Sequence, residues 1–292
     1  MRIYKSFIAV LFIGLGAQAG AQEITQSGFS PLYIGVDHAT ATVPSNPTST
    51  GAARTSRAYI VRIDMKAPGI AFTATPQSGS METTSETTSQ FAASAGVRVA
   101  INTNFFSPCC ATAPEPKNVI GALVSKGVVV SPPDGEPGSS EAVLAITRNN
   151  RATIAHVSEI DFSRTYTAVA GSAILVKDGE DVSAQSPNQG DPLNPNPRTL
   201  VGLSKSGRYM YWVVIDGRVT GYSLGTTNAQ SAALMLALGC DDAMNLDGGG
   251  SSEIVRADKV GHPFIVNNPS GGAERYSAAA MGVYAFPLPF SG

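Results

Sequence analysis

The residues best suited to chemistry lie in one short run, Asn245-Leu246-Asp247-Gly248-Gly249-Gly250-Ser251-Ser252. Three consecutive glycines let the backbone approach a ligand closely, and successive amide N–H groups in such a turn can form one concave anion site. The two serine hydroxyls add donors at its end. Because an Asn and an Asp lie on the same run, we predict a site for a sugar hydroxyl or a phosphate. The alternative is a plain tight turn in which Asp247 bonds only its own glycines.

The same run resembles the signature of the phosphodiester glycosidase family. Five further segments resemble that family in the same order along the chain: residues 100–106, 171–179, 196–202, 216–218 and 274–275. The resemblance implies a glycoside hydrolase that cuts the bond between a sugar's anomeric carbon and a phosphate. Two stretches depart from the family pattern, Thr103-Asn104 and Pro108-Cys109-Cys110, and they leave the substrate open.

Cleavage of a glycoside needs carboxylates, and binding of a phosphate needs cationic donors. The transition state resembles an oxocarbenium ion, which one carboxylate stabilises or captures while a second moves a proton, so Asp247 and Glu274 are the predicted catalytic pair. A guanidinium group is a planar fork that fits phosphate oxygens. The predicted substrate-binding residues are Asn102, Asn104, Arg198, Asp216, Asn245, Gly248, Gly249, Ser251, Ser252 and Arg275.

Several of these residues also have a purely structural interpretation. Glu274 could form a salt bridge with Arg275, and Arg198 could do the same on the surface. Asn102 and Asn104 end a predicted strand beside Phe105 and Phe106, which suits holding sugar hydroxyls against a ring. We expect at least one of the two phenylalanines to be core instead.

Other chemistries find little support in the sequence. The three histidines, His38, His156 and His262, have no His or Cys at metal-ligand spacing, so a zinc site is not expected. No cofactor is predicted, although a divalent cation held by Asp and Asn oxygens near Asp247 remains open. An esterase using Ser251 lacks a nearby His. The main alternative function is a non-catalytic module that binds envelope glycans or phosphate-linked polysaccharides.

The elements that position these residues are mostly short strands. Two helices are expected, one approached through residues 81–86 and reaching Ala95, the other from about Thr227 to Leu238 with Gly239 ending it. We predict an α/β fold of the α+β type, with a mixed, mostly antiparallel sheet, a few packed helices and a single domain. That domain spans residues 58–288 and follows an extended surface segment at 22–57. Strands are predicted over residues 58–64, 70–75, 97–102, 119–124, 127–131, 142–147, 151–155, 168–176, 199–203, 209–215, 243–246, 253–257 and 278–286.

The first 21 residues have the order of a secretory signal peptide. Arg2 and Lys5 precede an apolar run, and the small residues Ala19-Gly20-Ala21 follow it, so we expect cleavage near Ala21 and a secreted or periplasmic protein. The loss of these two cations changes the formal charge from −2 to −4. A negative chain does not favour nucleic acid, and no later run is apolar enough to span a membrane. The expected partner is a carbohydrate or sugar-phosphate substrate.

Three cysteines complete the inventory. Export permits a disulfide, and adjacent cysteines bridge each other only through a strained ring, so the favoured pairing joins Cys109 or Cys110 to Cys240. A bridge between the two adjacent residues and three free thiols are the alternatives.

Overall fold

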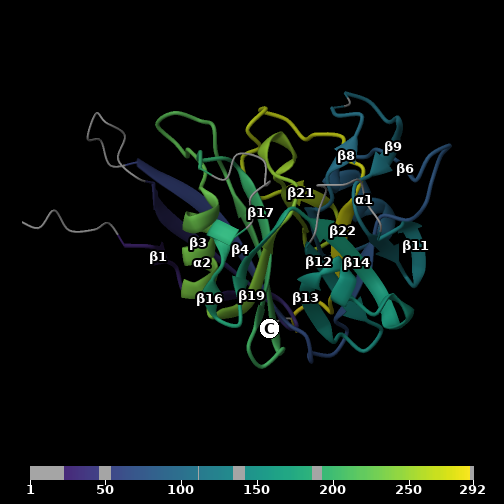
Figure 1. The fold of residues 1–292 in the computed structure, drawn as a ribbon, viewed down its shortest axis with the longest axis horizontal. Helices are drawn as coiled ribbons and strands as arrows, with labels where there is room; N and C mark the ends of the chain where they lie inside the picture. Colours follow the sequence, from purple (N-terminus) through teal and green to yellow (C-terminus); the bar gives the residue numbers. More distant parts are fainter. Residues whose placement is uncertain (1–22, 46–53, 111, 134–141, 186–192, 290–292) are drawn as a thin grey trace, which may run out of the picture.

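The computed structural model describes residues 23–45, 54–110, 112–133, 142–185 and 193–289 (Figure 1). The predicted signal peptide therefore lies outside the described residues. Strands dominate what is described, and every pairing between them is antiparallel. None of the helices in this part of the chain has the length and apolar character needed to cross a membrane.

The largest sheet has nine strands and carries most of the candidate site. Its order is β1-β3-β4-β18-β17-β19-β15-β16, with β2 paired to β3. In that order the strands are β1 (Thr25–Gln26), β3 (Val36–Ser45), β4 (Arg54–Asp64), β18 (Tyr209–Ile215), β17 (Arg198–Ser204), β19 (Cys240–Asn245), β15 (Ala173–Lys177) and β16 (Glu180–Asp181), and β2 is Ser30–Tyr33. Strand β19 lies inside the sheet, between β17 and β15, so the residues that follow Asn245 leave the sheet from its interior and not from an edge.

Three smaller sheets complete the fold. One has the order β11 (Val128–Ser131), β10 (Leu123–Ser125), β14 (Thr165–Gly171), β12 (Ala142–Thr147) and β13 (Ala152–His156). The next is β21 (Pro263–Ile265), β20 (Ile254–Ala257), β7 (Val99–Asn102), β22 (Ala280–Tyr284) and β5 (Ala71–Ala74). The third is β6 (Thr83–Thr84), β9 (Pro116–Val119) and β8 (Phe106–Ser107). Four 3-10 turns lie at η1 (Val157–Glu159), η2 (Phe162–Arg164), η3 (Ser183–Gln185) and η4 (Gly249–Ser251).

One core cluster joins the three larger sheets. Trp212 of β18 is fully buried and meets Phe72 of β5 edge to face, with ring centroids 6.1 Å apart. Leu144 of β12 and Met281 of β22 belong to the same cluster. The sheets are therefore parts of one folding unit, since each buries an apolar face against the others.

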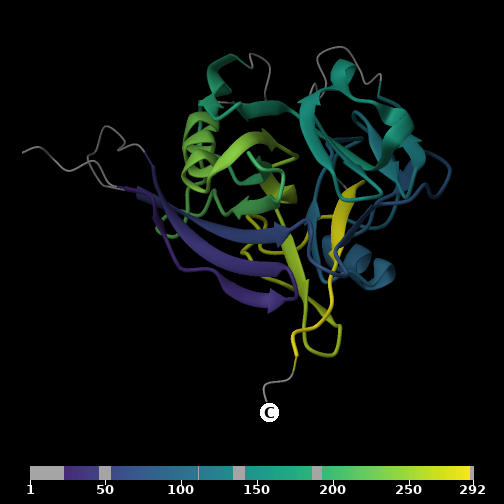
Figure 2. The same cartoon turned by 90° about the horizontal axis from the view of Figure 1, so that it is seen from below.

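The two α-helices pack on different sheets. Helix α2 (Asn228–Ala237) covers the nine-stranded sheet, and α1 (Thr88–Ala95) packs against β7, β20 and β22, as Figure 2 shows for the green and blue helices. Both begin with a reciprocal capping box, formed by Thr227 with Gln230 and by Thr87 with Gln90. The predicted bounds of α2 are confirmed to within a residue. The predicted end of the first helix at Ala95 is confirmed, and the residues that lead into it include β6, since Thr83 and Thr84 pair with β9.

The fold class needs a correction. The mostly antiparallel sheet is confirmed, but the α/β assignment is wrong, because the described residues contain only two α-helices and the fold is predominantly β. The extended N-terminal segment also lies deeper than expected. Strand β3 pairs with β4 along its whole length, and its Ala39 and Val43 are buried in the apolar cluster that also contains residues of α2.

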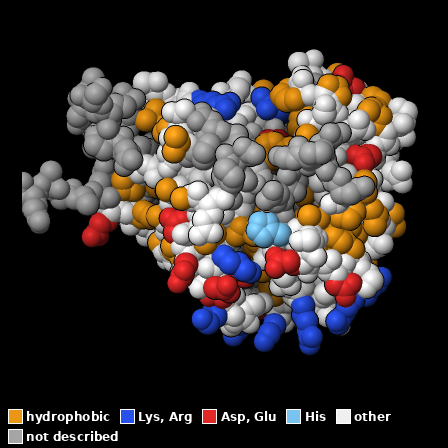
Figure 3. All heavy atoms as spheres, in the orientation of Figure 1, with side chains coloured by type: hydrophobic (Ala, Val, Ile, Leu, Met, Phe, Trp, Pro, Cys, Tyr) orange, Lys and Arg blue, Asp and Glu red, His pale blue; other side chains and the backbone are white. Residues whose placement is uncertain are grey.

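Charged side chains of both signs gather toward the lower edge of the face drawn in Figure 3.

Candidate active site

The glycine run leaves the centre of the largest sheet and crosses to neighbouring segments. Leu246 N donates to Thr199 O at 2.8 Å, and Asp247 N donates to Thr103 O at 2.7 Å. Gly249 N then donates to Pro197 O at 3.0 Å, and Gly249 has a φ of 63°, a left-handed conformation that favours glycine. The backbone of the run is thereby tied to two segments that lie far from it in sequence.

This run forms one wall of a cavity of about 390 Å³. Three arginines, three glycines and one carboxylate contribute to the lining, together with an aromatic ring and small polar groups. The lining residues are Phe105, Ser172, Asn196, Pro197, Arg198, Arg218, Asn245, Asp247, Gly248, Gly249, Gly250 and Arg275. Three guanidinium groups around one carboxylate leave a net positive cavity, which suits an anionic ligand.

Asp247 is the only carboxylate among those lining residues, and it is 8% exposed. Burial raises its pKa to about 7, while the Ser251 hydroxyl, the Arg275 charge and the Gly248 amide oppose that rise. A carboxyl with a pKa near neutrality exists in both protonation states at physiological pH. Such a group can act as a carboxylate or carry a proton without a large free-energy cost.

The three arginines are held in different ways. Arg275 passes across Gly250, where any Cβ would overlap its guanidinium group, and Nη1 donates to Ser251 Oγ at 3.4 Å. Arg218 lies over Gly249 and donates through Nε and Nη2 to Asn196 Oδ1, at 3.2 and 2.9 Å. Arg198 is 4% exposed and donates through Nε to Thr226 O at 3.0 Å. The glycine run therefore also makes room for the guanidinium groups.

Arg218 was not among the predicted site residues. Its signal was available in the Asp216-Gly217-Arg218 turn, from which the prediction took the aspartate. The structure places that aspartate outside the cavity lining. The Asp216 carboxylate accepts hydrogen bonds from Tyr222 Oη, Asn267 Nδ2 and the backbone amide of Asn268, all between 2.8 and 3.2 Å.

Asn245 lines the cavity and has one unpaired side-chain oxygen. Its Nδ2 donates to Ser172 Oγ at 2.9 Å and to Leu246 O at 2.8 Å. Its Oδ1 is buried and has no hydrogen-bond partner among the described residues. Because an unmade buried hydrogen bond is costly, a ligand hydroxyl that donates to this oxygen would bind favourably.

The other two predicted asparagines, Asn102 and Asn104, donate to backbone carbonyl oxygens and do not face the cavity. Asn102 Nδ2 donates to Asp247 O at 2.7 Å, and its Oδ1 accepts from Thr199 Oγ1 and Glu253 N. Asn104 Nδ2 donates to the carbonyl oxygens of Ile120 and Ala122. Neither residue lines the cavity, and the same holds for Ser251 and Ser252. Ser251 nevertheless contacts both Asp247 and Arg275.

Glu274 faces away from the lining, toward the start of α1. Its Oε1 accepts from Ser89 N at 3.0 Å, and its side chain meets that of Glu253, which is 3% exposed. Burial raises the pKa of Glu253 to about 8, and the nearby Glu274 charge adds to the rise. Sequence analysis did not single out Glu253, because the contact joins two loops that are far apart in the sequence.

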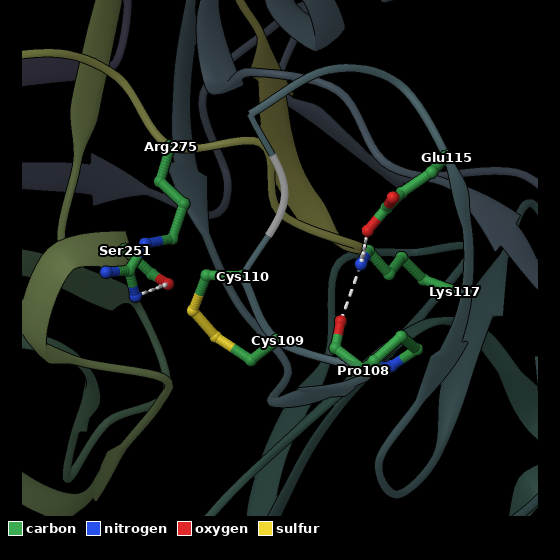
Figure 4. The surroundings of a disulfide bond; sticks show 7 residues. All are labelled: Pro108, Cys109, Cys110, Glu115, Lys117, Ser251 and Arg275. Carbon is green, nitrogen blue, oxygen red and sulfur yellow. Dashed lines mark hydrogen bonds and ion pairs between the residues drawn. A yellow bond between two sulfur atoms is a disulfide. The ribbon is translucent and has the colours of Figure 1, made fainter.

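The cysteines differ from the favoured pairing. Cys109 and Cys110 are bonded to each other, and Cys240 is a free thiol that is 4% exposed. The predicted bridge to Cys240 is wrong because that side chain packs in the apolar cluster with Met235 of α2. Figure 4 shows the disulfide with Ser251 and Arg275 among its surroundings, so it borders the site. The buried Lys117 anchors the same loop by donating to Pro108 O and pairing with Glu115.

No group of three or more His, Cys, Asp or Glu side chains that could hold a metal occurs within the described ranges. The arginines beside Asp247 disfavour a cation there, since three positive charges already share the cavity.

Comparisons with known proteins identify a family and a fold. A family model described as phosphodiester glycosidase matches residues 95–284, which include every lining residue. The catalytic domain of zebrafish N-acetylglucosamine-1-phosphodiester alpha-N-acetylglucosaminidase, auto-inhibited by its pro-peptide, has a similar fold. It superposes with a TM-score of 0.66 at 17% identity, over 89% of this chain and 87% of that one.

Two further similarities are less informative about activity. A hypothetical protein from Synechocystis superposes with a TM-score of 0.61 at 15% identity, over 88% of this chain and 64% of that one. The uncharacterized SPbeta prophage-derived protein YomE of Bacillus subtilis is 36% identical over 101 residues. Those residues are 35% of this chain and 15% of YomE, so the chain spans only a small part of that relative.

Proposed function

The chain belongs to the phosphodiester glycosidase family, and on that premise we propose that it hydrolyses sugar-1-phosphodiesters. In this reaction water adds to the anomeric carbon, and the bond from that carbon to the phosphate oxygen breaks. The electron pair leaves with the oxygen, so the products are the free sugar and a phosphomonoester. The two solved relatives described above are only 17% and 15% identical to this chain, so the substrate named here is our proposal for this chain.

The observation that carries the proposal is the presence of Asp247 and three guanidinium groups in one cavity. Arg198, Arg218 and Arg275 would hold the phosphate oxygens and stabilise the charge that collects on the leaving group. Asp247, as a carboxylate, would face the positive charge that develops at the anomeric carbon. Asn245 Oδ1 would accept a sugar hydroxyl, and the Phe105 ring would contact a face of the sugar.

This arrangement changes the role of the second predicted carboxylate. A phosphomonoester is a stable anion, and cationic donors lower its basicity further, so its departure needs little help from an acid. We therefore assign Glu274 a positioning role. Anchored on Ser89 N, it holds the chain immediately before Arg275.

Export is part of the same proposal. The order of residues 1–21 supports cleavage near Ala21 and a secreted or periplasmic location. N-terminal sequencing of the protein recovered from the medium or periplasm should begin at Gln22. Recovery of uncleaved protein from the cytoplasm would contradict this part alone.

The test of the activity is a substrate panel. Purified protein is incubated with sugar-1-phosphodiesters that differ in the sugar, and with aryl glycosides of the same sugars, and reducing sugar and phosphomonoester are measured. We expect equimolar release of both products from one or more phosphodiesters. Saturable binding of a phosphodiester without turnover would favour the glycan-binding alternative, and neither binding nor turnover on any member would contradict both.

A further inference from the structure

A second cavity, of about 320 Å³, lies between the nine-stranded sheet and the sheet that contains β20 and β21. It shares no lining residue with the arginine-lined cavity. Buried Val61, Val99 and Ile254 contribute to its walls, and Leu32 and Val266 extend the apolar surface outward. Its volume is at the lower end of the ~300–1,000 Å³ range of small-molecule sites. We call it the apolar groove.

One cation interrupts this apolar lining. Arg256 of β20 reaches the groove, with its guanidinium carbon 4.8 Å from the centroid of the Phe264 ring. Its Nε is buried and has no hydrogen-bond partner within the described ranges, where no carboxylate forms an ion pair with it either. A buried donor without an acceptor costs free energy, and no ion pair within the described ranges neutralises Arg256, so an anion that reached its guanidinium group from the groove would supply the missing acceptor.

Two acids whose charges act on the same groups as that of Arg256, Asp37 on His38 and Asp258 on Tyr33, have partners of their own. Asp37 pairs with Arg62 at 2.7 Å, and Asp258 accepts from Val260 N and His262 N. His38 also lines the groove, and its pKa is lowered first by burial and then by the charge of Arg256, against an opposing effect of Asp37. His38 is therefore neutral at physiological pH and supplies a hydrogen-bonding group without a second charge.

We propose that the apolar groove binds a carboxylate that carries an apolar chain. The carboxylate would accept from Arg256, whose planar fork matches its two oxygens, and His38 would bind one of them. The chain would lie against Val61 and would remove the partly exposed Leu32 and Val266 from water. The proposal does not depend on the hydrolase activity, because no lining residue is shared.

The test uses octanoate as the probe and acetate as its short counterpart. The NMR signals of His38 are followed during titration of the full chain with each carboxylate, and the pKa of His38 is measured with and without octanoate. We expect saturable shifts with octanoate, at least tenfold weaker binding of acetate, and a rise of half a unit or more in the pKa of His38. The sign follows because a bound anion favours the protonated imidazole.

Two variants separate the groove from non-specific binding. Arg256→Met keeps an apolar stem and removes the charge, and it should weaken octanoate binding at least tenfold. Arg148→Met is the matched control, because Arg148 also lies over an aromatic ring, that of Tyr166 at 4.4 Å, but on another sheet. It should bind octanoate as the unaltered protein does.

The wild-type measurements stand even where a variant fails to fold. An unchanged pKa of His38 in saturating octanoate would overturn the proposal. Equal binding of acetate and octanoate, or equal loss in the two arginine variants, would overturn it as well. None of these outcomes bears on hydrolysis, which the phosphodiester panel measures separately.

Discussion

The arginine-lined cavity and the apolar groove are similar in volume, about 390 and 320 Å³, and almost opposite in lining. The groove is walled mainly by the middle parts of strands, β3, β4, β20 and β21, whose apolar side chains supply most of its surface. The arginine-lined cavity takes its charged groups from the ends of strands. Asp247 follows β19, Arg198 begins β17 and Arg218 follows β18.

This difference shows where a predominantly β fold can place chemistry. A side chain in the middle of a strand has its direction set by the pleat and its neighbours set by the register. Residues at strand ends are free of both constraints, so segments from several strands can point their polar groups at one spot. The exception in the groove is Arg256, a charged residue within a strand. Because the two cavities share no lining residue, a substitution in one should leave the other unchanged.

Asp247→Asn should have the largest effect. It keeps the shape of the side chain and removes the charge, so turnover of a phosphodiester should fall at least 100-fold, about 2.7 kcal/mol in barrier. Octanoate binding at the groove should be unchanged. Activity above a tenth of the unaltered value, measured as kcat/KM, would show that Asp247 is not the catalytic carboxylate.

Arg198→Lys should come next. Lysine keeps the positive charge but loses the fork and the Nε donation to Thr226 O. On a phosphodiester we expect kcat/KM to fall tenfold or more, and on an aryl glycoside without phosphate threefold or less. Equal losses on the two substrates would assign Arg198 to structure instead.

Gly250→Ala tests whether the Arg275 guanidinium group can take its position only when residue 250 has no side chain. The added Cβ would overlap the Arg275 guanidinium group, whose flexible end can move away, so activity should fall about three- to tenfold with little change in Tm. Gly28→Ala is the control, because a Cβ at Gly28 meets nothing within 4 Å. A fall in Tm of more than about 5 °C in the Gly250 variant alone would point to a folding role.

The pH dependence should also distinguish the two cavities. Burial raises the pKa of Asp247 to about 7, above its unfolded value, so the folded state binds more protons between roughly pH 4 and 7. The free energy of unfolding should therefore fall as pH rises through that window, while activity that needs the carboxylate should rise. Asp247→Asn should lessen the first trend without abolishing it, because burial also raises the pKa of Glu253 to about 8 and that of Glu86 to about 7. Arg256→Met should leave the trend intact. Thermal melts from pH 4.5 to 8 measure the stability of each protein, and phosphodiester turnover over the same pH range measures the activity.

Reduction of the disulfide should have the smallest effect. A bond between adjacent residues closes almost no loop, so its chain-entropy contribution is small and Tm should change by less than about 2 °C. A bridge to Cys240 would close a loop of about 130 residues and stabilise by roughly 4 to 5 kcal/mol at most. Peptide mapping after alkylation without reduction should find Cys240 as a protected free thiol that reacts only on unfolding.

The sequence determined the local features of this protein. The turn-forming glycines after Asp247, the bounds of α2 and most of the short strands depend on near neighbours, and each was predicted. Both helices were predicted as well, but the strand content was underestimated, since Thr83 and Thr84 before α1 and residues 36–45 of the N-terminal segment pair with other strands.

Only the tertiary structure decided which distant segments meet. It placed Arg218 in the arginine-lined cavity and brought Glu274 into contact with Glu253. It also buried Cys240 in the apolar cluster with α2 and made Arg256 the one arginine in the lining of the apolar groove. Each of these depends on strand register and sheet packing across many residues of intervening chain. A pattern along the sequence records what a side chain is, whereas its partners are set by the free energy of the whole packed fold.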